Sequence, residues 1–111
     1  MIQASLLGEA LENAPMAAFV TDESGRYVAV NRAACAMLGY DREELLTLRI
    51  TDVARSEGAR AEYEEMTHEG SMAGTTALTR KDGSTVQFSY VAGATVVAGM
   101  QVFLSVGSAS G

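Results

Sequence analysis

The final third of the sequence has the composition of β-structure. From residue 71 onward, Thr, Val, Phe, Tyr and Gly replace the Glu- and Ala-rich pattern of the preceding segment. The apolar side chains Val86, Phe88, Tyr90 and Ala92 occupy every second position, as in an antiparallel strand with one buried face. Three strands are predicted, at residues 71–79, 86–94 and 100–106, with a turn at residues 80–84 joining the first two.

The N-terminal segment predicts a helix followed by a β-hairpin. An apolar stripe at helical spacing, without Pro or β-branched residues, predicts an amphipathic helix over residues 3–13, which Pro15 ends. The apolar runs at residues 16–21 and 27–30 predict two short strands. Gly25 lies between them and can take the positive φ that a tight turn requires.

The middle of the chain predicts short helices with clear end signals. Asn31 is a good N-cap for a helix over residues 32–38, and Gly39 follows where a left-handed residue ends a helix. Asp41, with Glu44 three residues later, resembles a capping box. Two further helical segments are expected, at residues 50–54 and 57–69.

Length and charge narrow the classes of function. A chain of 111 residues is expected to form one domain. Its formal net charge of -6 disfavours binding to nucleic acid or to an anionic membrane surface, and no apolar stretch approaches membrane-spanning length. Cys35 is the sole cysteine, which excludes an intramolecular disulfide and fits a reducing, cytoplasmic setting.

The sequence offers no recognisable catalytic set. It has one His, one Cys and acidic pairs without an adjacent base, and its glycines are scattered rather than gathered in a phosphate-binding loop. No Cys and His residues have the spacing of a zinc site. We therefore expect neither enzymatic activity nor a metal site.

Two stretches resemble signatures of the PAS domain family. Residues 30–46 (VNRAACAMLGYDREELL) resemble the segment in which an Asn opens a helix and a Gly-Tyr pair closes it. Residues 80–86 (RKDGSTV) resemble the hairpin between the third and fourth strands of the family. The resemblance runs from about residue 15 to residue 106. It implies an α+β fold, with a five-stranded antiparallel sheet, helices packed on one face and a small central pocket.

The resemblance also implies a role and an organisation. Such domains usually serve bacterial sensor kinases, cyclases or transcription regulators by sensing a ligand, dimerising or passing on a conformational change. An effector domain of a longer parent protein is therefore an expected partner. The expected divisions are an N-terminal amphipathic helix at residues 1–14, a PAS domain at residues 15–106 and a flexible Gly- and Ser-rich tail at residues 107–111.

A pocket for a small apolar ligand is the leading functional hypothesis. Nine side chains are candidates for its walls, and each is equally well explained as ordinary core. They are Phe19, Val30, Met37, Leu38, Ile50, Met66, Phe88, Tyr90 and Val102.

The identity of any cofactor stays open, with flavin and haem both disfavoured. Flavin-binding relatives carry a photoreactive Cys after the Gly-Tyr motif, whereas Cys35 precedes that motif, and Phe88 stands where such domains often have Asn. A haem-binding relative needs a His pointing into the pocket, whereas His68 shares a helix face with Arg60 and Glu64 and is predicted to point to water. Nor does Cys35 have the Tyr and Glu neighbours of the photoactive-yellow type.

The alternative function is a ligand-free module for dimerisation and protein interaction. The contact would use the N-terminal helix and the outer face of the sheet, giving a homodimer. The same helical stripe could instead pack on its own sheet as an ordinary cap. The stripe comprises Leu6, Leu7, Ala10, Leu11 and Ala14, and the first four are the predicted dimerisation residues.

Overall fold

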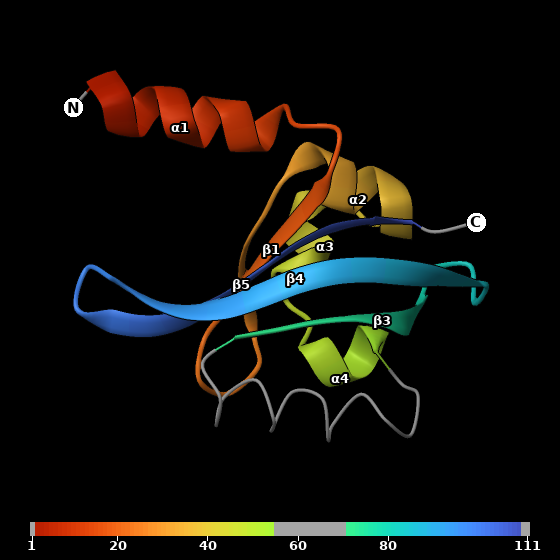
Figure 1. Ribbon diagram of the computed structural model, residues 1–111. Coiled ribbons are helices and arrows are strands. Elements are labelled where there is room, and N and C mark those ends of the chain that lie inside the picture. The colour runs from red at the N-terminus through yellow and green to blue at the C-terminus, as the bar shows by residue number, and fades with distance from the viewer. Residues whose placement is uncertain (1, 55–70, 110–111) are drawn as a thin grey trace.

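The computed structural model describes residues 2–54 and 71–109, which form one antiparallel sheet and four helices (Figure 1). The strand order across the sheet is β2-β1-β5-β4-β3. In chain order, the elements are α1 (Ile2–Glu12), β1 (Ala17–Thr21), β2 (Tyr27–Val30), α2 (Arg32–Leu38), α3 (Arg42–Leu45), α4 (Ile50–Val53), β3 (Ser71–Thr79), β4 (Thr85–Val97) and β5 (Met100–Ala109). The predicted five-stranded α+β fold is confirmed.

The main core lies between one face of the sheet and the short helices α2, α3 and α4. Leu38, Leu45 and Val53, one from each helix, are fully buried. They belong to the same cluster as Phe19 of β1 and Phe88 of β4. Burial of each such side chain contributes about 1.5–3 kcal/mol. The helix-covered face of the sheet is therefore the side on which an internal site could form.

The predicted helix ends are confirmed by their hydrogen bonds. The Asn31 side chain accepts a bond from the Ala34 N–H at 3.0 Å and caps α2. Gly39 ends that helix at a φ of 77°, in the left-handed region. The Glu44 carboxylate accepts from the Asp41 N–H at 2.9 Å, which starts α3 as the capping box predicts.

The last two strands are longer than their sequence suggests. Strand β4 continues to Val97 and β5 to Ala109, so the predicted flexible tail is wrong for residues 107–109. Gly107 pairs with Ala17 on one side and Tyr90 on the other. A Cβ atom at Gly107 would lie 2.0 Å from the Ser89 carbonyl oxygen. The small residues that resemble a linker therefore allow close packing of adjacent strands.

Two remaining predictions concern the helices. The longer helix predicted at residues 57–69, with Met66 and His68, lies outside the described residues. Within the described ranges, no helix is long and apolar enough to cross a membrane.

Candidate functional site

Four aromatic rings form a row across the helix-covered face of the sheet. Tyr27 of β2 lies 5.5 Å from Phe19 of β1, measured between ring centroids. Phe19 meets Phe88 of β4 edge to face at 5.6 Å, and Phe88 stacks on Tyr90 at 5.7 Å with 13° between the ring planes. Such pairs add about 0.5–1.5 kcal/mol each beyond their burial. This aromatic row is the centre of the candidate site.

The row is possible because β5 carries small side chains where the rings cross it. Strand β5 lies between β1 and β4, so Phe19 and Phe88 must meet above it. On the face that these rings share, β5 presents Ser105, Gly107 and Ala109. A large side chain at these positions would occupy the space that the rings fill.

The Tyr90 end of the aromatic row is less enclosed and more polar than the Tyr27 end. Tyr90 is half-buried, and its hydroxyl donates to the Met72 sulfur at 3.6 Å. Gly74 is its partner on β3, and a Cβ there would lie 3.6 Å from the Tyr90 hydroxyl oxygen. The Tyr90 ring therefore lies against the bare backbone of β3.

An unpartnered hydroxyl group lies beside this end of the row. Thr76 pairs with Phe88 in the β3–β4 register, which turns its side chain to the same face. Within residues 2–54 and 71–109, Thr76 Oγ1 is the one buried side-chain nitrogen or oxygen without a hydrogen-bond partner. A buried unsatisfied polar group costs about 1–3 kcal/mol, so this oxygen can gain from a bound hydrogen-bonding group.

The structure describes eight of the nine predicted pocket residues. Phe19, Val30, Leu38 and Phe88 are buried in the main core. The partly buried residues that pack against that core are Met37, Ile50 and Tyr90. Val102 is also buried, and Met66 lies outside the described residues.

Val102 is buried but faces away from the other predicted wall residues. Its neighbour Phe103 pairs with Thr21 and packs with Ala92 on the helix-covered side. Adjacent residues of a strand point to opposite faces, so Val102 belongs to the outer face. The prediction of Val102 as a wall residue is therefore wrong, and Phe103 is the β5 side chain on this face, which the sequence pattern does not distinguish from Val102. Knowledge of the strand register could have identified it.

The single described cysteine does not have the environment of a reactive thiol. Cys35 lies on α2, half-buried against the core. Burial raises the pKa of its thiol, which disfavours the nucleophilic thiolate. In the described part of the chain, no three His, Cys, Asp or Glu residues come together to hold a metal ion.

The C-terminal end of α1 is attached to the core by two side chains. The Asn31 amide donates to the Leu11 carbonyl at 2.6 Å and to the Met16 carbonyl at 2.9 Å, while its oxygen accepts from the Ala18 N–H at 2.9 Å. Asn31 thus joins α1, β1 and α2. In sequence it is recognisable only as a helix cap.

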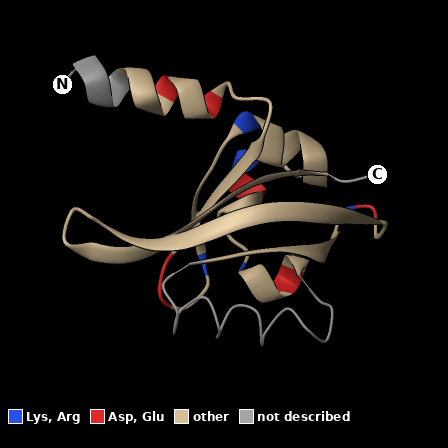
Figure 2. Cartoon of the chain, in the orientation of Figure 1, with Lys and Arg blue, Asp and Glu red and all other residues tan. Residues whose placement is uncertain are grey.

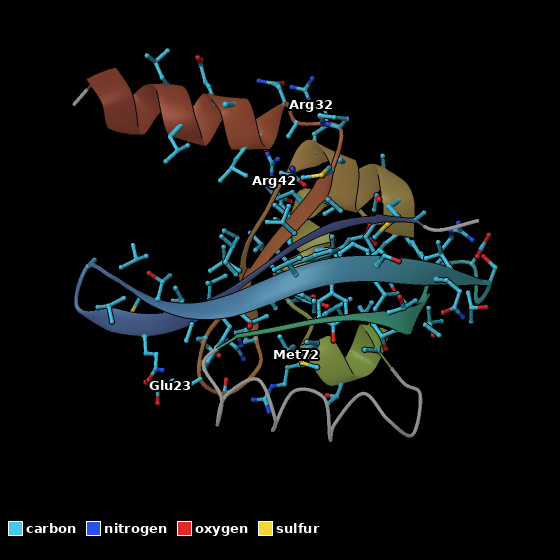
Figure 3. The ribbon with its side chains drawn as sticks, viewed as in Figure 1. Glu23, Arg32, Arg42 and Met72 are labelled. Atoms are coloured by element: carbon cyan, nitrogen blue, oxygen red, sulfur yellow. The ribbon has the colours of Figure 1, made fainter. Side chains whose placement is uncertain are left out.

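Arg42 makes the second attachment. Its guanidinium group donates to both Glu12 carboxylate oxygens, at 2.5 and 2.6 Å, and to the Val30 carbonyl at 3.2 Å. The hydrogen bond from Arg42 lowers the pKa of Glu12. Figure 3 shows Arg42 between α1 and the helices below it.

The rest of α1 leaves its apolar stripe uncovered. Leu6 and Leu7 are 60% and 64% exposed, Ala10 is also exposed, and Leu11 is partly buried. Figure 1 shows α1 extending away from the sheet. Three of the four predicted dimerisation residues are therefore available for a contact, and Leu11 is only partly accessible.

The comparisons with known proteins agree on the fold. A PAS domain from a two-component sensor histidine kinase has a TM-score of 0.87 at 18% identity, with 98% of this chain and 97% of that chain covered. The PAS domain of an HTR-like protein from Haloarcula marismortui has a TM-score of 0.85 at 25% identity, with 98% of each chain covered.

A third structure comes from a sensory box sensor histidine kinase/response regulator of Geobacter sulfurreducens. Its domain has a TM-score of 0.79 at 23% identity, with 96% of this chain and 93% of that chain covered. No curated protein matches the sequence. The family model described as PAS domain matches residues 15–107, and the chain therefore belongs to the PAS domain family of signalling modules.

Proposed function

We propose that this PAS domain senses a small, largely apolar ligand on the helix-covered face of its sheet. The observation that carries the proposal is the buried hydroxyl of Thr76 beside the aromatic row, which has no hydrogen-bond partner among residues 2–54 and 71–109. Ordinary cores satisfy such groups, because each unsatisfied one lowers stability. A ligand that hydrogen-bonds to Thr76 would remove this cost.

The surroundings of Thr76 suggest the chemistry of the ligand. Phe88 and Tyr90 present parallel rings, and Met72 supplies an adaptable, polarisable side chain. The predicted wall residues in this cluster are apolar or aromatic. Phe88, Tyr90 and Met72 offer no opposite charge to a buried ion, so we expect a neutral ligand with an apolar body and one hydrogen-bonding group.

The core also provides a route from the ligand to α1. Leu38 of α2 packs in the same cluster as Phe88. Helix α2 is capped by Asn31, whose side-chain amide donates a hydrogen bond to the Leu11 carbonyl at the end of α1. A ligand that displaces α2 would therefore change how α1 is held. We propose that α1 relays this change to an effector domain of a longer bacterial-type signalling protein.

The first experiment combines native mass spectrometry with an absorption spectrum of the same sample. Extra mass on the folded chain identifies a retained ligand, and a visible band identifies a coloured one such as flavin or haem. If the chain is bare, a panel of small neutral apolar compounds is tested for thermal stabilisation. A bare chain that no compound stabilises would contradict ligand sensing.

Thr76→Val tests the role of the hydroxyl group. Val has nearly the same shape, so the ligand-free variant should be as stable as the wild type or about 1 kcal/mol more stable. Loss of one hydrogen bond to the ligand should weaken binding by about fivefold to thirtyfold. Thr75→Val is the matched control, because Thr75 is exposed on the other face of β3. If both variants bind the ligand with equal affinity, the Thr76 hydroxyl does not contact the ligand.

A second candidate function is a ligand-free interaction module. Its support is the exposure of Leu6 and Leu7 on α1, together with Val91, which is 65% exposed on the outer face of the sheet. This function predicts a homodimer whose measured mass depends on concentration and does not respond to ligands. Leu7→Lys should then favour the monomer, because it places a charge within the apolar stripe of α1.

A further inference from the structure

Helix α1 is attached to the rest of the described chain near its C-terminal end. Its apolar residues Leu6 and Leu7 are exposed, and Figure 1 shows the helix extending away from the sheet. The attachments come from Asn31, which caps α2, and from Arg42, the first residue of α3. Both side chains reach the last turn of α1. The orientation of the helix therefore depends on these contacts.

The contacts made by Asn31 and Arg42 differ in physical character. Asn31 is only 5% exposed, and its neutral amide donates to the Leu11 and Met16 carbonyls. The ion pair of Arg42 with Glu12 is partly open to solvent, with side chains that are 46% and 33% exposed. Dissolved salt screens such a pair, whereas a neutral buried hydrogen bond is little affected. We call the Asn31 bonds the pivot contact and the Glu12–Arg42 pair the release contact.

The charge of Glu12 ties α1 to the arginines beside it. Helix α1 has no basic residue in its last turn, so Glu9 and Glu12 lie there against the helix dipole. Figure 2 shows these acidic residues toward the end of α1 where α2 begins. The hydrogen bond from Arg42, and after it the charges of Arg42 and Arg32, lower the pKa of Glu12. A neutral residue at position 12 should therefore free α1 without weakening the helix itself.

Arg42 also connects the release contact to the core. Its Nε donates to the Val30 carbonyl, at the end of β2, at 3.2 Å. Helix α3, which Arg42 begins, carries Leu45, and that side chain is fully buried in the same cluster as Phe88. A displacement of α3 by a change in this cluster would therefore move the guanidinium group away from Glu12.

We propose that α1 swings as a folded helix about the pivot contact when the release contact opens. Opening follows from a displacement of α3 or from a rise in ionic strength. The inference rests on the relay role proposed above for α1. It adds the contact that is broken, the contact that is kept, and salt as a physical signal that acts without a ligand.

Distances between two spin labels measure the orientation of α1. In a Cys35→Ala background, one label is attached to Leu6→Cys on α1 and the other to Gln87→Cys on β4, both at exposed positions. Leu6 lies about 9 Å along the helix from Glu12, so a swing of about 30° moves its label by about 5 Å. Labelled protein is diluted into an excess of unlabelled protein, so that only distances within one copy are measured.

The parent protein should give one narrow distance distribution at low salt. Glu12→Gln should widen the distribution by about twofold or more, and an ionic strength of about 1 M should widen that of the parent but not that of the variant. Glu9→Gln is the matched control, because it removes the same charge from the same turn and Glu9 belongs to neither ion pair found among residues 2–54 and 71–109. This control should stay narrow. A narrow distribution in Glu12→Gln, or equal widths in the two variants, overturns the inference.

Amide hydrogen exchange separates swinging from unfolding. In Glu12→Gln, exchange in α1 should rise by less than about threefold, because the helix and the pivot contact remain. A rise of about tenfold or more would show that the helix unfolds, which overturns the inference. Neither measurement uses a ligand, so a failure of ligand sensing leaves the result standing. Conversely, a helix that does not move in Glu12→Gln refutes this inference and leaves ligand sensing unaffected.

Discussion

Gly107→Ala should destabilise this domain far more than a single methyl group normally does. The added Cβ would lie 2.0 Å from the Ser89 carbonyl oxygen and 2.7 Å from the Tyr90 Cα. Real Cβ atoms do not approach other atoms so closely, and the obstructing atoms are backbone atoms that cannot rotate away. Strand β5 would have to move away from β4.

The expected loss of stability in Gly107→Ala can be worked out from the cost of overpacking. Added methyl groups in well-packed interiors cost about 1–3 kcal/mol, and a backbone obstruction places this position at the upper end, near 3 kcal/mol. For a domain of this length, 1 kcal/mol lowers Tm by about 4 °C, so the expected decrease is about 12 °C. Because Phe19 and Phe88 meet above β5, the near-ultraviolet circular dichroism of the rings should weaken as well.

Thermal melting followed by circular dichroism measures the effect, with Gly8→Ala as the matched control. Gly8 lies in α1, and a Cβ there would meet no atom within 4 Å. Ala is favoured over Gly in a helix by about 0.8–1 kcal/mol, so this variant should keep the Tm of the wild type or exceed it. If Gly107→Ala melts within about 2 °C of the wild type, β4 and β5 do not approach as closely as the argument requires.

Two further predictions concern the attachment of α1 and the pH dependence of stability. Asn31→Asp keeps the side-chain acceptor but loses the amide donors to Leu11 and Met16. Amide hydrogen exchange in α1 should therefore rise by about tenfold or more, while the amides of α2 stay protected. Equal exchange rates in both helices would contradict this. Burial, followed by the charge of Asp52, raises the pKa of Tyr27 above its ordinary value of about 10. The folded state then binds the Tyr27 phenol proton more tightly than the unfolded chain does. The contribution of Tyr27 to stability is therefore fully present below pH 10 and is lost as the pH rises above it. Tyr27→Phe should flatten this alkaline decrease in chemical denaturation, and an unchanged slope would refute the assignment.

Local signals in the sequence are sufficient to predict most of the elements. Asn31 and Gly39 mark the two ends of α2 because capping needs a side-chain acceptor at one end and a left-handed residue at the other. The alternation from Val86 to Ala92 predicts the core face of β4 because one-sided burial imposes a period of two. These signals depend on neighbours within a few residues.

The candidate site depends on long-range neighbours, and the sequence predicts less of it. Val102 and Phe103 are both large and apolar, and only pairing with β1 decides which one faces the helices. Thr76 is notable because its hydroxyl has no hydrogen-bond partner in the described part of the chain, a property of the packed structure alone. The second role of Asn31, its hydrogen bond to the Leu11 carbonyl, likewise depends on where α1 lies.

The two faces of β5 explain why its C-terminal half resembles a linker in sequence. Its helix-covered face carries Ser105 and Gly107, which leave room for Phe19 and Phe88 to meet, while its outer face carries larger apolar side chains such as Leu104. The small residues in the C-terminal half of β5 therefore indicate close packing against neighbouring strands and rings, not a flexible linker. Because the proposed ligand site lies on one face and the proposed dimer contact on the other, the sheet is the single layer that separates them, and β4 carries residues of both. A shift of the rings should consequently reach the outer face through β4 and its neighbour β5, and Gly107→Ala should disturb both the ligand site and the dimer.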